Sequence, residues 1–282
     1  MISGRIVPSA LLLFFFACGT AVLCRDATRE TSAIAALQGT TTKVPLRSTE
    51  RLPDAAGEAK VERKGGTTEV EVHLDAMKPA SLFGGDYNTY VLWVVPPGGR
   101  AENLGELQLD GERATLAAST DATSFAVLVT AEPHFLVNAP SAFVVLENRP
   151  ARQAPGIRYQ LLEGVYNFER SSLDDVKPAK GRVHTEVKQA FTAVRLAQRA
   201  GAARFAPEEL NEAQRALDET FDLWRRRVDR MEIATQAHET IRLALAAQRL
   251  AEDRAFLGAR VQVEGLGGGN GEAGGRNPRG QQ

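Results

Sequence analysis

The sequence predicts an α+β chain in two separate parts: an antiparallel, Ig-like β-sandwich, then an antiparallel α-helical hairpin or three-helix bundle. Two observations predict this class. Over residues 59–148, apolar runs of strand length are separated by Pro, Gly and Asp-Gly turns, and no helical period crosses them. From residue 183 onward, the apolar period changes from two to about 3.6 residues. Because no helices separate the strands, a sandwich is favoured over a parallel βαβ sheet.

The composition limits the chemistry that the chain can carry. Its 282 residues leave room for two domains and linkers, and 34 Lys and Arg balance 35 Asp and Glu, so no net field attracts nucleic acid. The two cysteines, Cys18 and Cys24, both lie near the N-terminus. The rest of the chain therefore has no thiol for a disulfide, a zinc site or a nucleophile. No P-loop, G-x-S-x-G or H-E-x-x-H motif occurs, and no cofactor or metal is expected.

Residues 1–24 are typical of an export signal. Their apolar run, at residues 10–17, is shorter than the ~20 residues of a membrane span and fits a signal peptide. Cys18 resembles the lipidated cysteine of bacterial lipoproteins, although Phe15 stands where those signals usually carry Leu, and Cys24 fits less well. Three outcomes stay open: a lipid anchor at Cys18, cleavage and release, or an uncleaved anchor. Each places the remaining chain outside the cytoplasm.

The next part of the chain predicts a tether followed by the first hairpin of the sandwich. Residues 25–58 are rich in Thr, Ala, Arg and Glu without a sustained period, so we expect a flexible tether there. The sandwich itself is expected over residues 59–148. It begins with a hairpin, because apolar residues alternate with polar ones on both sides of Gly65-Gly66. The glycine-containing segment at residues 83–88 is either a ligand-binding loop or a corner of the sandwich, and the corner is favoured.

The central stretch of the sandwich, residues 90–148, contains several apolar runs. They predict strands at residues 90–95, 114–118, 125–130 and 143–146. The Pro-Pro-Gly-Gly sequence at residues 96–99 must turn, because proline fixes φ and glycine supplies a positive φ. Asp110-Gly111 is a strong hairpin signal before the second of these strands.

Several short features of this stretch also occur in a recognisable order. They are residues 90–96 (YVLWVVP) with the glycine-rich turn after them, Leu104-Gly105, Leu107, residues 130–133 (TAEP), Pro140 and residues 144–147 (VVLE). In this order they resemble the extracytoplasmic domain of anti-sigma-K-type factors, a small β-sandwich, over roughly a fifth to a third of the chain. The resemblance implies a fold and an extracytoplasmic location. Since few residues precede the apolar N-terminal run, we do not expect anti-sigma activity.

The second half of the chain predicts a linker and a helical domain. We expect a linker at residues 149–182, in which residues 157–168 form an extra edge strand or a bridge. The α-helical domain is expected at residues 183–261, as antiparallel helices that share an Ala-rich seam.

Three helices are expected in that domain, and their ends carry clear signals. The first helix stops at Gly201, and the second starts at Pro207, a residue suited to the first helical position. Asp229 and Glu232 form a capping box for the third helix, which should fade near Ala259.

The connection between the first two helices carries a second resemblance. Its residues are Ala-Gly-Ala at 200–202 and Ala-Pro-Glu-Glu-Leu at 206–210. They resemble a helical family of unknown function found in bacterial OmpA-type envelope proteins, where an OmpA-like domain that grips peptidoglycan follows. Here residues 262–282 are Gly-rich and are expected to be disordered. Peptidoglycan binding through an OmpA-like domain is therefore not expected.

Few residues stand out as candidates for a site. His73 and His134 have no second ligand at metal spacing. Glu132 could anchor a ligand, but closing a loop is the favoured role. Asp174-Asp175 is more typical of a helix start than of a catalytic pair. The three arginines at residues 225–227 could contact acidic lipid or glycan, although a solvated helix end is favoured.

Together these features predict a non-catalytic, exported cell-envelope protein, lipid-anchored at Cys18, in the periplasm or outer membrane. It would act as a structural or protein-binding module whose partners are envelope proteins or cell-wall components, with no nucleic acid. An alternative is a periplasmic sensing module that signals to a membrane partner. A glycan-directed enzyme is a third hypothesis, which only exposed carboxylates support.

Overall fold

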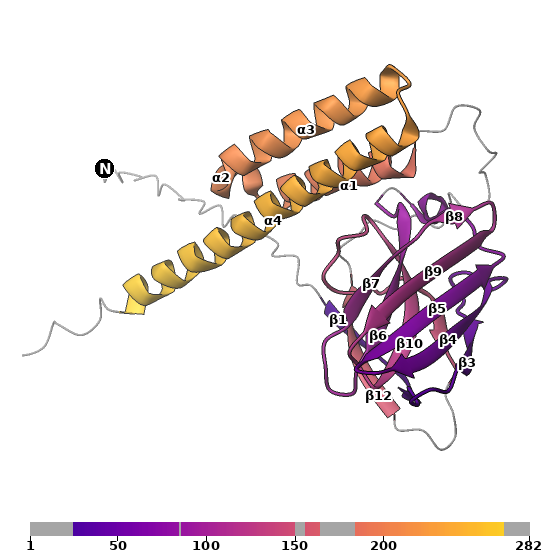
Figure 1. The fold of residues 1–282 in the computed structure, drawn as a ribbon. Coiled ribbons are helices and arrows are strands. Elements are labelled where there is room, and N and C mark those ends of the chain that lie inside the picture. The colour runs from indigo at the N-terminus through magenta and orange to yellow at the C-terminus, as the bar shows by residue number, and fades with distance from the viewer. Residues whose placement is uncertain (1–24, 85, 150–155, 164–183, 268–282) are drawn as a thin grey trace, which may run out of the picture.

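The computed structural model describes residues 25–84, 86–149, 156–163 and 184–267, and it shows a β-rich region followed by helices (Figure 1). The strands are β1 (Arg25–Ser32), β2 (Ile34–Ala35), β3 (Thr42–Ser48), β4 (Ala56–Lys64), β5 (Thr67–Asp75), β6 (Thr89–Val95), β7 (Glu102–Leu107), β8 (Leu109–Asp110), β9 (Arg113–Thr120), β10 (Ser124–Glu132), β11 (Val144–Asn148) and β12 (Gly156–Glu163). The segment predicted to be an export signal, with Cys18 and Cys24, lies outside the described residues.

The β-rich region is mostly one antiparallel sheet that curls almost into a barrel. Its strand order is β7-β6-β10-β11-β3-β4-β5-β9-β8, with β2 paired beside β10. The two ends of this path meet, because the Thr120 hydroxyl on β9 donates a hydrogen bond to Glu102 Oε2 on β7 at 2.6 Å. An antiparallel β-rich part followed by a helical part is therefore confirmed.

Strand β6 is apolar along its whole length because both of its faces are covered. Leu92 and Val94 lie in the main core inside the barrel, whereas Trp93 and Val95 lie in a second cluster on the outer face. A strand that is buried on both faces needs apolar residues at every position. The apolar run that predicted this strand is explained by the second, outer cluster.

The outer cluster is covered by a two-stranded antiparallel ribbon of β1 and β12. The flexible tether predicted over residues 25–58 is therefore wrong, since this segment forms β1, β2, β3 and the start of β4. Arg29 and Thr31 of β1 are polar and form hydrogen bonds to the barrel: Arg29 donates to Glu147 Oε1 at 2.9 Å, and the Thr31 hydroxyl donates to the Asn148 carbonyl oxygen at 2.9 Å. Strand β1 therefore lacks the alternation of apolar and polar residues by which a strand is predicted from sequence. Residues 157–168 were predicted as an extra edge strand or a bridge; their described part, residues 157–163, belongs to strand β12.

Both predicted hairpins are present. Strands β4 and β5 pair around Gly65-Gly66, and Gly65 has a φ of 62°, which few residues other than glycine adopt without strain. Strands β8 and β9 pair around residues 111–112. The local turn signals therefore located these connections correctly.

Among the described residues, four helices follow the β-rich region: α1 (Thr185–Arg199), α2 (Ala202–Phe205), α3 (Pro207–Arg225) and α4 (Arg230–Gly267). Helices α1 and α3 both pack along α4 (Figure 1), and the seam between them is rich in buried alanine. As predicted, α3 begins at Pro207. The Asp229 carboxylate caps α4 by accepting a hydrogen bond from the Met231 backbone N–H at 2.8 Å.

Helix α4 is longer than the sequence predicts. It continues to Gly267, past the expected fading near Ala259 and the expected domain end at residue 261. Glycine lowers helix propensity, but its backbone can still form the hydrogen bonds of a helix. The helix end predicted from the Gly-rich composition is therefore too early in the chain. None of the described helices combines the length and the apolar character that crossing a bilayer requires.

Candidate functional site

The junction between the barrel and the helices is built from buried polar side chains. Asp86, in the segment before β6, is 1% exposed and accepts two hydrogen bonds from the Arg199 guanidinium of α1, at 2.8 and 3.0 Å. The Asn88 side-chain amide donates to the Thr192 hydroxyl of α1 at 2.9 Å. Asp86 and Asn88, from the segment predicted as a corner or a ligand-binding loop (residues 83–88), therefore hold α1 on the barrel.

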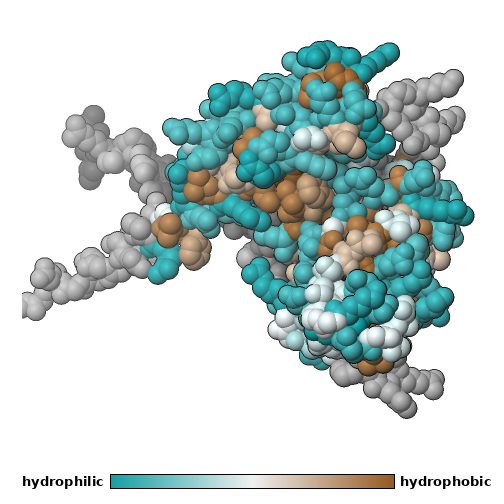
Figure 2. All heavy atoms as spheres, in the orientation of Figure 1, coloured by the Kyte–Doolittle hydropathy of each residue, from teal (hydrophilic) through white to brown (hydrophobic). Residues whose placement is uncertain are grey.

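A third polar contact joins α1 to two other parts of the barrel. The buried side chain of Gln189 accepts a hydrogen bond from the Phe135 backbone N–H at 2.9 Å and donates to Glu106 Oε1 at 2.6 Å. Phe135 and Leu136 also pack against the apolar core of the helices. Figure 2 shows hydrophobic atoms gathered in the region where the helices meet the barrel. Directional hydrogen bonds and apolar packing together fix the orientation of α1 on the barrel.

Glu132, at the end of β10, is a fully buried carboxyl close to this junction. Its Oε1 accepts hydrogen bonds from the Ser141 backbone N–H at 2.7 Å and from the Thr130 hydroxyl. Thr130 in turn accepts one from Trp93 Nε1 at 2.8 Å. Because Ser141 lies at the far end of the loop after β10, the predicted loop-closing role of Glu132 is confirmed. Its Oε2 has no hydrogen-bond partner among the described residues, and burial raises the pKa of Glu132 to about 8.

His134 is the second buried titratable group at the junction. It is 3% exposed, and its Nδ1 has no hydrogen-bond partner in the part of the chain that the structure describes. Burial, together with the positive charge of Arg249 on α4, lowers the pKa of His134 to about 4. The ring of the next residue, Phe135, lies 4.6 Å from the ring of His238 on α4. The described residues include no group of three or more His, Cys, Asp or Glu side chains placed to hold a metal ion.

A second buried carboxylate, Glu147 on β11, ties the β1–β12 ribbon to the barrel. Its Oε1 accepts hydrogen bonds from Arg29 of β1 at 2.9 Å and from Arg47 of β3 at 2.7 Å. Its Oε2 accepts one from the Tyr159 hydroxyl of β12 at 3.2 Å. Burial, with the Glu147 carboxylate nearby, raises the pKa of Tyr159. Sequence reasoning missed this cluster, because its members are far apart in the chain and no local motif joins them.

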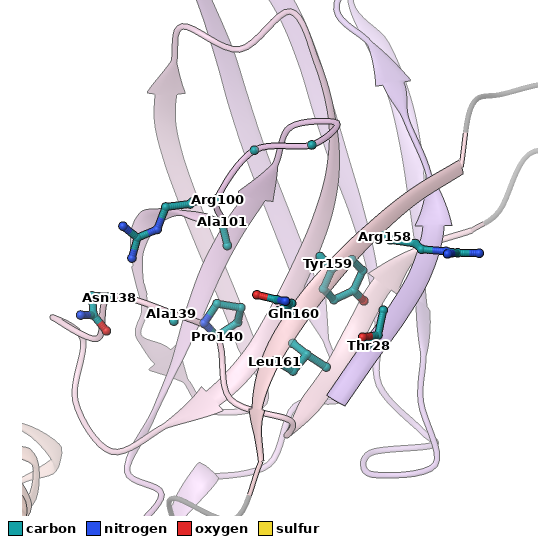
Figure 3. A pocket seen from close by; sticks show the side chains of 12 residues that line it. Thr28, Arg100, Ala101, Asn138, Ala139, Pro140, Arg158, Tyr159, Gln160 and Leu161 are labelled. Carbon is teal, nitrogen blue, oxygen red and sulfur yellow. The ribbon is translucent and has the colours of Figure 1, made fainter. Parts of the chain in front are cut away.

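A pocket of about 630 Å³ lies beside the same ribbon (Figure 3). One wall is formed by residues 158–161 of β12, and the other by residues 98–101 after β6 and residues 138–140 after β10. Figure 3 shows the Gln160 side chain directed from β12 toward Pro140. The sequence predicted the turn after β6, but the pocket exists only because β12 folds back opposite that turn.

The remaining sequence candidates fall outside these sites. The arginines at residues 225–227 are exposed at the C-terminal end of α3, as predicted. His73 lies on β5, where its Nε2 is 3.0 Å from Glu71 Oε1. Asp174-Asp175 and Cys18 lie outside the described residues.

No protein-family model, curated protein or solved structure significantly matches this chain. The resemblances to the anti-sigma-K-type domain and to the helical family of OmpA-type proteins therefore stay predictions. The junction and the pocket are therefore the features of the molecule that bear on its function.

Proposed function

We propose that this is a non-catalytic, exported cell-envelope protein that acts as a structural or protein-binding module. The observation that supports this function is the junction, where buried hydrogen bonds hold α1 on the barrel in one orientation. Because each bond is directional, an altered orientation would leave buried polar groups unpaired. Two folded parts in a fixed relation suit a protein that presents surfaces to partners.

The shape of the helical part supports the same function. Helix α4 has 38 residues, which gives it a length of about 57 Å. Figure 1 shows that its C-terminal part projects beyond the other helices, away from the barrel. Phe256 and Leu257 follow Ala251, the last buried residue of α4 whose side chain the structure describes, and they are 64% and 58% exposed. The barrel and the end of α4 thus offer two separate surfaces for contact with envelope proteins or cell-wall components.

We place the protein in the periplasm or at the outer membrane, anchored by a lipid on Cys18. The support is the apolar run before Cys18 and the short distance from Cys18 to the first strand, which begins at Arg25. Seven residue steps span at most about 25 Å when fully extended. A lipid at Cys18 would therefore hold the barrel close to the membrane surface.

The intact mass of the protein from separated membrane and soluble envelope fractions tests this location. A membrane-bound species that begins at Cys18 and carries added acyl mass is the expected result. A soluble species that begins further downstream would remove the anchor and leave a diffusible periplasmic module. Recovery of the chain from the cytoplasm would contradict the envelope function as a whole.

A second candidate function, periplasmic sensing, is favoured by the two titratable groups beside the junction. A change in the protonation of Glu132 or His134 would place a charge in a buried site next to the helices. Affinity purification from cells distinguishes the two functions. Recovery of porins or assembly factors supports the structural module, whereas recovery of a sensor kinase or a sigma-factor regulator supports sensing.

We also keep the Ig-like sandwich as a proposal for the strand arrangement. Its support is that the β1–β12 ribbon lies as a second layer on β6 and β10, with an apolar cluster between the layers.

A further inference from the structure

One edge of β12 has no strand partner among the described residues. Strands β1 and β12 form a two-stranded sheet of their own, so β12 bonds to β1 along one edge only. In an antiparallel pair, every second residue directs its N–H and C=O groups away from the partner strand. The free edge of β12 therefore carries backbone donors and acceptors that a further strand could pair with.

This free edge is one wall of the pocket. Residues 158–161 line it together with Thr28 of β1, and Figure 3 shows Gln160 and Leu161 between Thr28 on one side and Pro140 on the other. Four strand residues extend over roughly 10–13 Å. With a volume of about 630 Å³, the pocket has room for a short extended peptide beside β12.

The pocket is held in shape before any partner arrives. Tyr159 of β12 is fixed from below by its hydrogen bond to Glu147, and Leu161 packs in the outer apolar cluster. On the opposite wall, the Gly99 backbone N–H donates to the Pro96 carbonyl oxygen at 3.1 Å and closes the turn. Binding to a preformed edge costs less ordering than binding to a flexible one.

The charges around the pocket favour an acidic occupant. Arg100 is exposed and forms no ion pair with any described residue. Arg158 is also exposed, and its partner is Glu30 on the neighbouring strand at 3.4 Å. No Asp or Glu is among the described residues that line the pocket. A carboxylate close to Arg100 would therefore be attracted by the Arg100 guanidinium, and no carboxylate among the described lining residues would repel it.

We propose that an extended segment of a partner protein adds to the free edge of β12 as a third strand, with an Asp or Glu side chain near Arg100. This inference rests on the proposed function, because it identifies the binding surface of the protein-binding module. Main-chain hydrogen bonds to β12 provide affinity, and the contact with Arg100 provides preference for acidic segments.

Protection of the edge is the competing explanation for this arrangement. Charged side chains on an edge strand discourage pairing, and Arg158 has such a position. The two explanations make opposite predictions, because a protected edge binds no peptide, whereas strand addition gives binding that depends on every second amide of the peptide.

The probe is a phage-displayed library of random linear peptides, selected against the immobilised full chain. Enriched peptides should contain Asp or Glu, and a bound peptide should slow amide hydrogen exchange in β12 while leaving β5 unchanged. A library that yields no binder would overturn the inference. Binders that protect only other elements would overturn it as well.

An enriched peptide is then synthesised in two N-methylated versions, called phases here. One carries methyl groups on its odd-numbered backbone amides, and the other carries them on its even-numbered backbone amides. Because a strand bonds to one neighbour through every second residue, one phase should weaken binding at least about tenfold and the other should retain it. Equal loss in both phases, or in neither, would contradict strand addition.

Charge reversal tests the preference for acidic segments. Arg100→Glu should weaken binding of the enriched peptide about fivefold. The matched control is Arg113→Glu, since Arg113 is likewise exposed but lies on β9 outside the pocket. The thermal melt of Arg100→Glu should coincide with that of the parent chain, whereas Arg113→Glu should melt slightly lower because it loses its exposed ion pair with Asp75. Equal peptide affinity for the two variants would remove Arg100 from the proposal.

Failure of this inference can be told apart from failure of the proposed function. An envelope-located chain that binds its partners but no peptide at β12 would overturn the inference alone. Recovery of the chain from the cytoplasm would overturn the proposed function, and peptide binding could still be measured on the purified protein.

Discussion

The barrel and the helices bury different kinds of core. The largest fully buried side chains of the barrel part include Trp93, Tyr90, Phe83 and Phe125. The helical seam consists mostly of alanines: Ala190, Ala193, Ala197, Ala202, Ala206, Ala213, Ala237, Ala244, Ala247 and Ala251. Each buried methylene contributes about 0.8 kcal/mol, so a buried alanine contributes much less than a buried aromatic side chain. The barrel should therefore be stable by itself, whereas the helices should depend on their contact with it.

The junction has a clear role in this comparison. It adds Phe135 and Leu136 to the apolar core of the helices, and it adds the ion pair between Asp86 and Arg199. The part of the molecule with the weaker core thus receives additional contacts from the part with the stronger one. Substitutions in the barrel core, at the junction and at the far end of α4 should have effects that decrease in this order.

The largest effect is expected at Trp93. The Trp93→Ala substitution removes a fully buried ring and the donor to Thr130, and it should lower the free energy of unfolding by about 3–5 kcal/mol. Urea denaturation measures this loss as a lower midpoint. The matched truncation in the helical seam, Ala244→Gly, should cost only about 1 kcal/mol. Similar losses for the two variants would break the comparison between the cores.

The next effect is expected at the junction. The Arg199→Met substitution leaves the buried Asp86 carboxylate without its main partner and should cost about 2–3 kcal/mol. This is below the usual cost of breaking a buried pair, because Arg195 lies 4.0 Å from Asp86 and remains. Hydrogen exchange should become faster in α1 while β4 and β5 keep their protection.

The double variant Asp86→Asn with Arg199→Met is the control for that experiment. It removes the buried charge together with its partner, so it should recover part of the lost stability. Faster exchange throughout the barrel in the single variant would show that the barrel also depends on the helices.

The third effect is a pH dependence that comes from the two buried groups beside the junction. The pKa of Glu132 rises from an ordinary 4.5 to about 8 in the folded chain. The protonated Glu132 therefore makes its full contribution to the free energy of unfolding below about pH 4.5, and this contribution is lost as the pH rises to about 8. The pKa of His134 falls from an ordinary 6.5 to about 4, so its contribution is lost as the pH falls from about 6.5 to about 4. The two slopes oppose each other between about pH 4.5 and 6.5.

A net loss of stability is therefore expected between about pH 6.5 and 8, on the order of 2 kcal/mol. In the Glu132→Gln variant this loss should disappear, and stability should fall only toward acid pH. In the His134→Leu variant the loss should instead begin near pH 4.5. Unfolding midpoints in urea, measured across this pH range, give all three curves. A parent curve that is flat from pH 6.5 to 8 would show that Glu132 is ionised at little cost.

Local signals account for the features that the sequence predicted correctly. The apolar run at residues 90–95, the turn at Gly65-Gly66 and the helix start at Pro207 each depend on residues next to one another in the chain. The features that were missed depend on distant partners. In strand β1, the charge of Arg29 is balanced by Glu147, which is more than a hundred residues away in the chain. No period or motif in a single sequence carries that information.

The candidate site follows the same rule. The loop-closing role of Glu132 was predictable because Ser141 is only nine residues away. The contact of residues 83–88 with α1 was missed, and a corner was favoured there, because the partner of Asp86 is Arg199 on a helix of the other part. The pocket beside β12 was not predicted, since its lining residues come from four separate segments of the chain.

The smallest effect is expected at the end of α4. Leu257 is 58% exposed and follows Ala251, the last buried residue of α4 whose side chain the structure describes, so Leu257→Ala should change the free energy of unfolding by less than about 0.5 kcal/mol. The matched control is Leu210→Ala in α3, where the leucine is buried against the same seam and the loss should be about 2–3 kcal/mol. Urea denaturation at two protein concentrations measures both. A larger loss for Leu257→Ala that grows with protein concentration would show that the end of α4 is packed against another copy of the chain, and the helices would then rely on that contact as well as on the barrel.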